Sequence, residues 1–278
     1  MNAKKTTCEK QNRTKVHFVD NYLLSPTNPI TVNLIGAGGT GSKVLTALME
    51  MNHSLLELGH AGLFVRLWDD DIITDANLGR QRFFESELGL PKSVALINRV
   101  NRCTGTNWKA ENRKYERNHF KKIPENALAT LTFTCVDNVQ TRFEVADILK
   151  ELNAHNRGYR DKPKYWLDFG NNRYTGQVIL STVGEIKQPD SEKYESVENL
   201  PFVTEEYGDL LRQSELKDDT PSCSLAEALK KQDLYINSAL TQMGCSLLWG
   251  LFRNGMTEYR GFFLNLKDFR SQPIPVAQ

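Results

Sequence analysis

Apolar residues along the chain follow two alternating patterns. Short, nearly uninterrupted apolar runs are typical of strands buried in a sheet, and apolar residues that recur every three or four positions are typical of helices. The short runs predict strands over residues 30–35, 63–68, 129–135 and 165–169. The helical pattern predicts helices over residues 42–51, 92–102 and 139–152. This order predicts stacked βαβ units, and therefore an α/β fold with a mostly parallel sheet flanked by helices.

The pattern changes in the C-terminal half, where antiparallel strands are expected. An extended strand is predicted over residues 173–183, and a last strand over residues 257–265. Between them, residues 185–219 hold eleven acidic and four basic residues, which predicts a long surface loop or a mobile crossing segment. A long helix follows this segment. Its predicted apolar face consists of Ile236, Leu240, Met243, Leu247 and Leu251.

We expect one domain between two tails. The basic tail spans residues 1–19, the domain spans residues 20–270, and a loose tail spans residues 271–278. The first fifteen residues hold five cations against one acid and lack an apolar core, so they predict a solvated tail and not a secretory signal. No apolar stretch is long enough to span a bilayer.

Net charge and cysteine content argue against several classes of partner and of structural site. The 278 residues carry a formal net charge of +1, which favours neither nucleic acid nor an anionic membrane as a partner. The five cysteines are scattered without a CxxC pair, which argues against a disulfide scaffold and against structural zinc. The histidines show no metal-ligand spacing. Without an export signal, the expected location is cytoplasmic.

A glycine-rich turn follows the first strand. Gly36, Gly38 and Gly41 fit the pattern G-x-G-x-x-G, and Gly39 adds a fourth glycine. Such a turn lets the backbone approach phosphate groups, which then meet the free N–H groups and the positive dipole end of the next helix. Because a strand precedes it and a helix follows, the turn predicts a Rossmann-like nucleotide site. The alternative is a purely structural turn.

Acidic residues end the second strand. An acid at this place in a Rossmann-like unit accepts hydrogen bonds from ribose hydroxyls, so Asp69 is the candidate for ribose and Asp71 a further cofactor-binding candidate. Asp69 lies 28 residues after Gly41, more than the usual spacing of about 20. The first helix or its exit loop must therefore be longer, and residues 52–61 can supply that length. The alternative is a solvated strand end.

The next residues bear on the choice between a dinucleotide and a triphosphate. Up to this point an NAD-dependent oxidoreductase fits equally well. Arg80 and Lys92, with Asn77 nearby, follow the ribose strand. A triphosphate needs such cations more than a dinucleotide does, because charge builds up on the leaving pyrophosphate. The alternative is that both are surface charges.

Asp137 and Asn138 end the strand predicted at residues 129–135. Open α/β sheets bind ligands at the carboxyl ends of their strands. Mg²⁺ takes one or two carboxylates together with phosphate oxygens, so Asp137 is the candidate metal ligand and Asn138 a cofactor-binding candidate. The alternative is that Asp137 only caps the next helix.

These motifs together resemble the ThiF/MoeB/HesA and ubiquitin-activating family. The family pattern is G-x-G-G-x-G, then D-x-D, N-L-x-R-Q, G-x-x-K and a late D-N, and all five occur here in order between residues 30 and 138. Three segments, HFVDNYLLSP, LGRQRFFESELGLPK and INRVNRCTGT, most resemble the ThiF-like proteins of bacterial PRTRC gene systems. Two family features are missing, namely the zinc-binding CxxC pairs and the arginine-rich N-terminal motif, for which only Arg13 and the basic tail could substitute.

The resemblance implies an activity, a cofactor set and partners. It implies ATP with Mg²⁺ and no zinc, a ribose contact at Asp69, phosphate contacts at Asn77, Arg80 and Lys92, and a magnesium contact at Asp137. The implied reaction is adenylylation of a carboxylate, at the C-terminus of a small ubiquitin-like or sulfur-carrier protein. A homodimer is the implied assembly.

Cys223 is the candidate for a second chemical step. The element Pro221-Ser222-Cys223-Ser224 follows the polar segment and resembles the P-x-C-[ST] site of ubiquitin-activating enzymes. A thiolate there would attack the acyl adenylate and form a thioester. The alternative is that Cys223 is a small buried apolar residue.

Two rival functions remain. An NAD-dependent oxidoreductase is disfavoured by Arg80 and Lys92 and by the lack of an evident catalytic His or Tyr-Lys pair. A degenerate adaptor that binds nucleotide or a partner without turnover is disfavoured by the retained charged residues.

Overall fold

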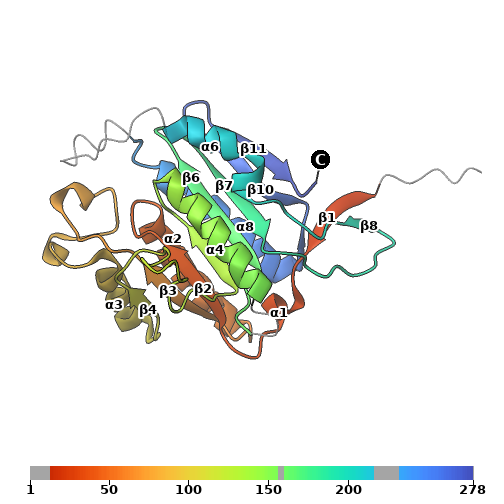
Figure 1. The fold of residues 1–278 in the computed structure, drawn as a ribbon, viewed down its shortest axis with the longest axis horizontal. Helices are drawn as coiled ribbons and strands as arrows, with labels where there is room; N and C mark the ends of the chain where they lie inside the picture. The colour runs from red at the N-terminus through yellow and green to blue at the C-terminus, as the bar shows by residue number, and fades with distance from the viewer. Residues whose placement is uncertain (1–12, 156–159, 216–231, 278) are drawn as a thin grey trace, which may run out of the picture.

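An eight-stranded sheet forms the centre of the molecule (Figure 1). A computed structural model of the chain describes residues 13–155, 160–215 and 232–277. The sheet has the strand order β11-β10-β7-β6-β5-β2-β3-β4. The parallel strands are β6 (Tyr165–Asn171), β5 (Leu131–Thr134), β2 (Ile30–Ile35), β3 (Leu63–Trp68) and β4 (Lys109–Glu111). The antiparallel extension consists of β7 (Thr175–Thr182), β10 (Tyr259–Asn265) and β11 (Arg270–Pro275). This confirms the predicted fold class.

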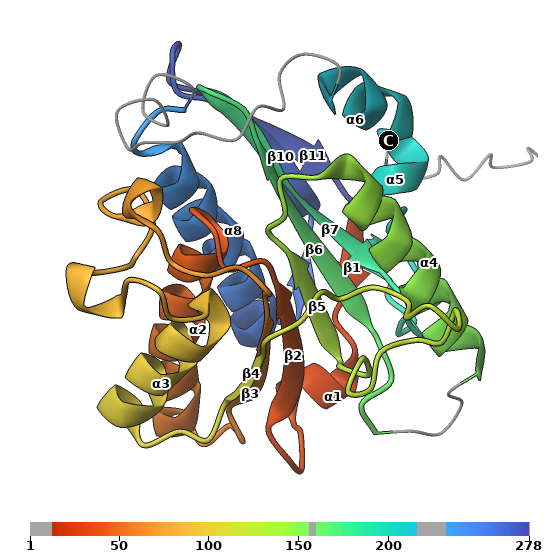
Figure 2. The ribbon, with the colours of Figure 1, turned by 60° about the vertical axis from the view of Figure 1, so that its left-hand side comes forward.

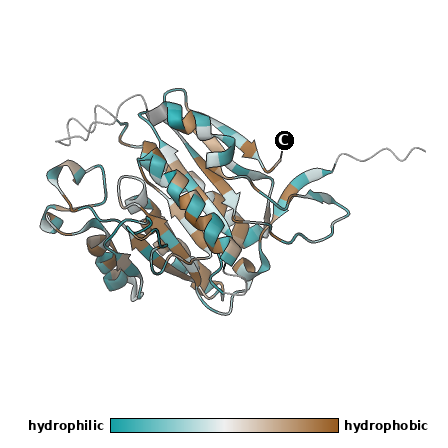
Figure 3. Ribbon diagram, viewed as in Figure 1, coloured by the Kyte–Doolittle hydropathy of each residue, from teal (hydrophilic) through white to brown (hydrophobic). Residues whose placement is uncertain are grey.

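Helices cover both faces of the sheet (Figure 2). One layer consists of α2 (Gly41–Glu57), α3 (Lys92–Thr104) and α8 (Ile236–Asn254). The other consists of α4 (Val139–His155), α5 (Val203–Glu206) and α6 (Gly208–Glu215). Strands buried on both faces are apolar at every position rather than at every second one, and all six residues of β2 are indeed buried. In α4, by contrast, apolar and polar residues alternate along the helix (Figure 3).

The central elements agree with the hydrophobic pattern. β2 and β3 have the predicted bounds, and the predicted helices and the strand at 165–169 extend by a few residues. The helix α2 continues to Glu57, which supplies the extra length that the spacing between Gly41 and Asp69 requires.

The prediction of a surface loop over residues 185–219 agrees with the structure for most of 185–202, which has no helix and only one short strand, but it is wrong for 203–215. Residues 185–215 contain β8 (Tyr194–Ser196), which pairs in parallel with β1 (Thr14–Phe18), and then α5 and α6. Phe202 and Val203 are buried against α4 and the sheet. A few apolar anchors therefore hold a mostly acidic segment on the molecule. Residues 216–219 lie outside the described residues.

Both predicted tails contain strands in the described residues. β1 lies within the expected basic tail and pairs with β8 and with β9 (Met256–Thr257), so Val16 and His17 are buried. β11 lies within the expected loose tail and pairs along its length with β10, with Ile274 and Val276 buried. Residues 1–12 lie outside the described residues.

The apolar face of α8 differs from the predicted one at Met243, which is 36% exposed. Gly244 faces the sheet instead, where a Cβ atom would come within 2.6 Å of the Phe169 ring. Glycine at this position lets α8 pack closely on β6 and β7, and Leu248 continues the buried face.

The sheet topology has a switch point beside β2. The chain passes from β2 outward to β3 and β4, and then returns to β5 on the other side of β2. Ligands of open α/β sheets bind where the strand order reverses, outside the carboxyl ends of the strands. That place lies between the ends of β2 and β5. None of the described helices is long and apolar enough to cross a membrane.

Candidate active site

The glycine turn joins β2 to α2 and passes close to the end of β5. Gly36 has a φ of +93°, and a Cβ atom there would lie 2.8 Å from the carbonyl oxygen of Cys135. A Cβ atom on Gly41 would overlap with the carbonyl oxygen of Gly36. Both positions therefore require glycine. At Gly38 a Cβ atom would meet no atom within 4 Å, so the outer side of the turn is open to a ligand.

Asp69 binds the glycine turn directly. Strand register places Ile35, Trp68 and Thr134 side by side, so the residues that follow them meet at one edge. The Ala37 N–H donates to Asp69 Oδ2 at 2.6 Å, and the Asp71 N–H donates to Asp69 Oδ1 at 3.0 Å. Burial raises the pKa of the Asp69 carboxyl above its ordinary value, although the Ala37 N–H and Lys92 oppose this. Each oxygen keeps a lone pair for a further donor.

Lys92 and Asp71 bind each other. The Lys92 Nζ lies 2.7 Å from Asp71 Oδ2, with the lysine side chain 8% and the aspartate side chain 65% exposed. Lys92 begins α3, and its backbone N–H donates to the Asp71 carbonyl at 2.9 Å. The structure therefore brings these two predicted site residues together as an ion pair at the end of β3.

Asn77 builds the loop that carries Arg80. Its Oδ1 accepts from the Thr74 N–H at 2.8 Å and from the Thr74 hydroxyl at 3.1 Å, which holds the short 3-10 turn η1 (Asp75–Asn77). The carbonyl end of the Asn77 amide is thus occupied within the protein. We infer that its local role is to shape the loop.

The guanidinium of Arg80 is only partly paired. Its Nη1 donates to Gln232 Oε1 at 3.0 Å, while its Nε is buried without a hydrogen-bond partner in the part of the chain that the structure describes. Burial lowers the pKa of Arg80, and the charge of Asp137 opposes this. Asp137 and Arg80, which lie on two different loops, are therefore close enough for their charges to interact.

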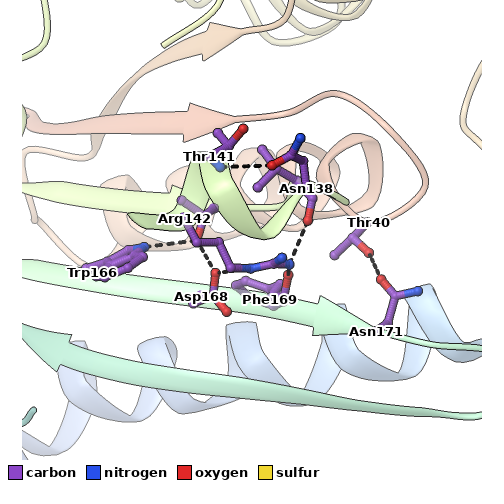
Figure 4. Close-up of polar contacts among 10 residues, drawn as sticks. Thr40, Asn138, Thr141, Arg142, Trp166, Asp168, Phe169 and Asn171 are labelled. Atoms are coloured by element: carbon purple, nitrogen blue, oxygen red, sulfur yellow. Dashed lines mark hydrogen bonds and ion pairs between the residues drawn. The ribbon is translucent and has the colours of Figure 1, made fainter. Parts of the chain in front are cut away.

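Asn138, and not Asp137, caps α4. The Asn138 Oδ1 accepts from the Thr141 N–H at 3.0 Å (Figure 4). Asp137 is exposed, and within the described ranges its carboxylate has no hydrogen bond or ion pair. The interpretation of Asp137 as only a helix cap is therefore wrong, and its carboxylate is available to a ligand.

A buried ion pair beneath Asp137 was not predicted. Arg142 of α4 binds Asp168 of β6 through Nε at 2.9 Å, and its Nη2 donates to the Val136 carbonyl at 2.6 Å (Figure 4). Thr134 and Arg142 both donate to Asp168 Oδ1. The only sequence signal was the position of Arg142, three residues after Val139 and three before Val145 on the apolar face of the helix.

Lys43 and Asn237 are two further polar residues that the sequence analysis missed. Asn237, at the start of α8, accepts from the Thr40 hydroxyl at 3.0 Å and packs against Gly39. Thr40 also faces Asn171, at 3.5 Å (Figure 4). The Lys43 Nζ donates to the Arg80 carbonyl at 2.8 Å. A lysine directly after a glycine turn is the one signal that could have revealed Lys43.

Cys223 lies outside the described residues, as does Cys8. Among the cysteines that the structure describes, Cys245 is buried and its pKa is raised by burial to about 12. Burial also raises the pKa of Cys135. Neither thiol is suited to form a reactive thiolate at neutral pH.

The site residues fit a nucleotide with one magnesium ion. The open side of the glycine turn, the Asp69 carboxylate and the unpaired Arg80 Nε are suited to phosphate and ribose groups. No group of three His, Cys, Asp or Glu side chains within the described residues could hold a metal by itself. Mg²⁺ needs only one or two carboxylates when phosphate oxygens supply further ligands, and Asp137 can provide one.

Comparisons with known proteins place the chain in a family and a fold. The model of the ThiF family matches residues 18–275. No curated protein matches the sequence significantly. PaaA is a similar solved structure, with a TM-score of 0.57 and 14% identity over 89% of this chain and 73% of PaaA.

Escherichia coli MccB solved with MccA is a second similar structure, with a TM-score of 0.57 and 14% identity over 91% of this chain. The same enzyme solved with ATP gives a TM-score of 0.52 at 14% identity, also over 91% of this chain. The chain spans 65% of the length of MccB in both cases. At this identity the likeness concerns the fold.

Proposed function

The chain belongs to the ThiF family, and from this premise we propose that it uses ATP to adenylylate a carboxylate. The observation that carries the proposal is the pair of Asp137 and Arg80. Asp137 is an exposed carboxylate without a hydrogen bond or ion pair in the described chain, and it lies close enough to the partly unpaired Arg80 guanidinium for its charge to act on it. A dinucleotide needs neither group there, whereas a magnesium triphosphate needs both.

Each proposed role follows from a contact in the structure. Asp69 accepts hydrogen bonds from the ribose hydroxyls, because each of its oxygens keeps a lone pair beside the turn. The N–H groups at the start of α2 bind phosphate oxygens. Arg80 neutralises negative charge on the departing pyrophosphate, and Lys92 does so after exchanging part of its contact with Asp71. Asp137 holds Mg²⁺, which supplies further charge neutralisation when bound.

The proposed reaction is a displacement at the α-phosphorus. A carboxylate oxygen of the substrate forms a bond to that phosphorus, and the bond to the bridging oxygen breaks. Pyrophosphate leaves with the electron pair, and an acyl adenylate results. The protein contributes by positioning the reactants and stabilising charge, since the chemistry needs no protein nucleophile at this step.

We propose as substrate the C-terminus of a small ubiquitin-like or sulfur-carrier protein. Family membership and the resemblance to the ThiF-like proteins of PRTRC systems support this choice. MccB, which shares the fold, has been solved with ATP and with MccA, so this fold can hold a nucleotide and a second partner. A homodimer in the cytoplasm is part of the same proposal.

Calorimetry with ATP–Mg²⁺ and with NAD⁺ tests the nucleotide. We expect ATP–Mg²⁺ to bind and NAD⁺ to bind much more weakly. Tighter binding of NAD⁺ would reject the proposal in favour of an oxidoreductase. ATP–pyrophosphate exchange that depends on a carrier protein tests turnover, and nucleotide binding without exchange would instead identify a non-catalytic adaptor.

Thioester formation on Cys223 is the second step of the proposal. The variant Cys223→Ala should retain pyrophosphate exchange but lose a thiol-sensitive adduct with the carrier on a gel without reductant. Cys245→Ala is the matched control and should keep the adduct, because Cys245 is buried in α8. An adduct that survives Cys223→Ala would exclude this role, and acyl transfer would then go directly to an external nucleophile.

A further inference from the structure

Lys43 ties the glycine turn to the loop that carries Arg80. It lies in the first turn of α2, and its Nζ donates to the Gly39 carbonyl at 3.2 Å and to the Arg80 carbonyl at 2.8 Å. The neighbouring Ser42 hydroxyl accepts from the Arg82 N–H at 3.3 Å. Two adjacent side chains of α2 therefore hold the 80–82 segment against the start of the helix.

The position of Lys43 is electrostatically unfavourable in the protein alone. A cation at a helix N-terminus faces the positive end of the helix dipole. Lys43 has no carboxylate within 4.0 Å among the described residues, and the charged groups that act on it are Arg82 and Arg80. Burial, followed by these two charges, lowers the pKa of the Lys43 ammonium from 10.5 to about 8. Three cations and a helix dipole thus converge here, and among the described residues Asp137 is the acid that acts on Arg80.

A bound anion would offset the excess positive charge around Lys43. The two carbonyl contacts occupy two of the three hydrogen atoms of the Lys43 ammonium, so one remains for a further acceptor. The Arg80 Nε, which is buried without a partner in the described part of the chain, is an independent sign that an acceptor is missing from the same place. Arg82 is exposed and free to approach from the outer side.

We propose that Lys43, Arg80 and Arg82 form a single binding site for a polyphosphate, with Lys43 as a phosphate ligand and Arg82 as an outer contact. This inference rests on the proposed function, which it deepens by adding two residues to the phosphate site. The site binds the phosphate groups remote from the nucleoside, because Asp69, the proposed ribose ligand, contacts Ala37 near the start of the turn, whereas Lys43 contacts Gly39 nearer its end.

Binding affinities of matched variants test the site. Calorimetry would use ATP–Mg²⁺ and inorganic tripolyphosphate with the wild-type chain, Lys43→Met, Arg82→Gln and Lys150→Met. Loss of a hydrogen bond to a charged group predicts roughly tenfold weaker binding of both ligands to Lys43→Met. Arg82→Gln, which leaves the two carbonyl contacts of Lys43 intact, should weaken both by about twofold to threefold, as expected for an exposed charge. Lys150→Met removes an exposed lysine of α4 and should bind as the wild type does.

Proton uptake separates a phosphate ligand from a residue that only shapes the loop. A phosphate beside Lys43 raises its pKa, so binding at pH 8 should take up a fraction of a proton from the buffer. The binding heat of the wild type should therefore differ between buffers of high and low ionisation enthalpy, and this difference should vanish in Lys43→Met. A Lys43 that only held the Arg80 loop would not produce this difference.

The outcomes distinguish this inference from the proposed function. If Lys43→Met bound ATP as tightly as the wild type and took up the same fraction of a proton, the inference would be overturned and the proposed function would remain intact. Lys43-dependent binding of tripolyphosphate without any binding of ATP would support the phosphate site and reject the proposed function. Lost binding in Lys43→Met without proton uptake by the wild type would show a structural role only, and would also overturn the inference.

Discussion

Two pairs of charged residues lie near the segment that joins β5 to α4, and they differ in burial and pairing. Arg142 and Asp168 are 5% and 1% exposed at their side chains and bind each other. Asp137 and Arg80 lie above them and are only partly engaged with protein atoms. The comparison indicates two different roles. The lower pair holds the Val136 carbonyl in place, and the upper pair remains available to bind a ligand.

The largest effect is expected from breaking the lower pair. The variant Arg142→Met leaves the Asp168 carboxylate buried without its cation, which predicts a loss of about 3–5 kcal/mol in unfolding free energy. Urea unfolding measures this loss. The double variant Arg142→Met/Asp168→Leu should recover much of it, because both charges are then gone. An Arg142→Met variant as stable as the wild type would contradict the structural role of the lower pair.

A large effect on activity without an effect on stability is expected for the upper pair. Asp137→Asn removes the proposed magnesium ligand, which predicts a loss of roughly 100-fold or more in Mg²⁺-dependent pyrophosphate exchange. Its melting temperature should stay near that of the wild type, because Asp137 is exposed and makes no hydrogen bond within the described chain. Unchanged exchange in this variant would refute the metal role.

Asn138 sharpens the comparison because it neighbours Asp137 but caps α4. Asn138→Ala removes the acceptor of the Thr141 N–H and should cost about 1 kcal/mol in unfolding free energy. Asn138→Asp keeps an acceptor and should retain that stability. Thermal unfolding of the two variants checks this, and equal losses in both would show that the cap contributes little.

The smallest effect is expected from the pH dependence of Asp69. Because burial raises the pKa of this carboxyl in the fold, the charged form is disfavoured, and stability from this group falls as pH rises above its ordinary pKa of 3.8. Asp69→Asn removes this titration but also one of the two acceptors for backbone N–H groups, so the pH trend is the test. The stability of Asp69→Asn relative to the wild type should increase from pH 4 to pH 7. Urea unfolding at both pH values measures it. A relative stability that increases on acidification would contradict the sign.

The hydrophobic pattern correctly predicted those strands that are buried along most of their length. β2 and β3 are mostly apolar and mostly buried, with only Thr31, Asn33 and Arg66 as polar residues, so their bounds are visible in the sequence. β11 contains two prolines and mostly polar residues, since only one side packs and its partner β10 determines the pairing. Gly244 shows a second limit, because a hydropathy pattern does not reveal a glycine that is buried for close packing.

The upper charged residues could be predicted from the sequence, whereas the lower ones could not. Asp137 and Arg80 follow strands and belong to recognisable motifs, so their position at one sheet edge could be inferred. Arg142 and Asp168 are distant in sequence, and a buried arginine contradicts the usual expectation that arginine is exposed. Their pairing depends on the register between β5 and β6, which no local pattern specifies.

The two edges of the central sheet bear on how copies of the chain can associate. An exposed strand edge with free N–H groups can pair with a strand of another molecule. One edge here is β11, where Pro273 and Pro275 have no N–H to offer, and the other is β4, which spans three residues. Neither edge is suited to a continuous intermolecular sheet. Edge-to-edge pairing through β4 or β11 is therefore disfavoured in the eight-stranded sheet.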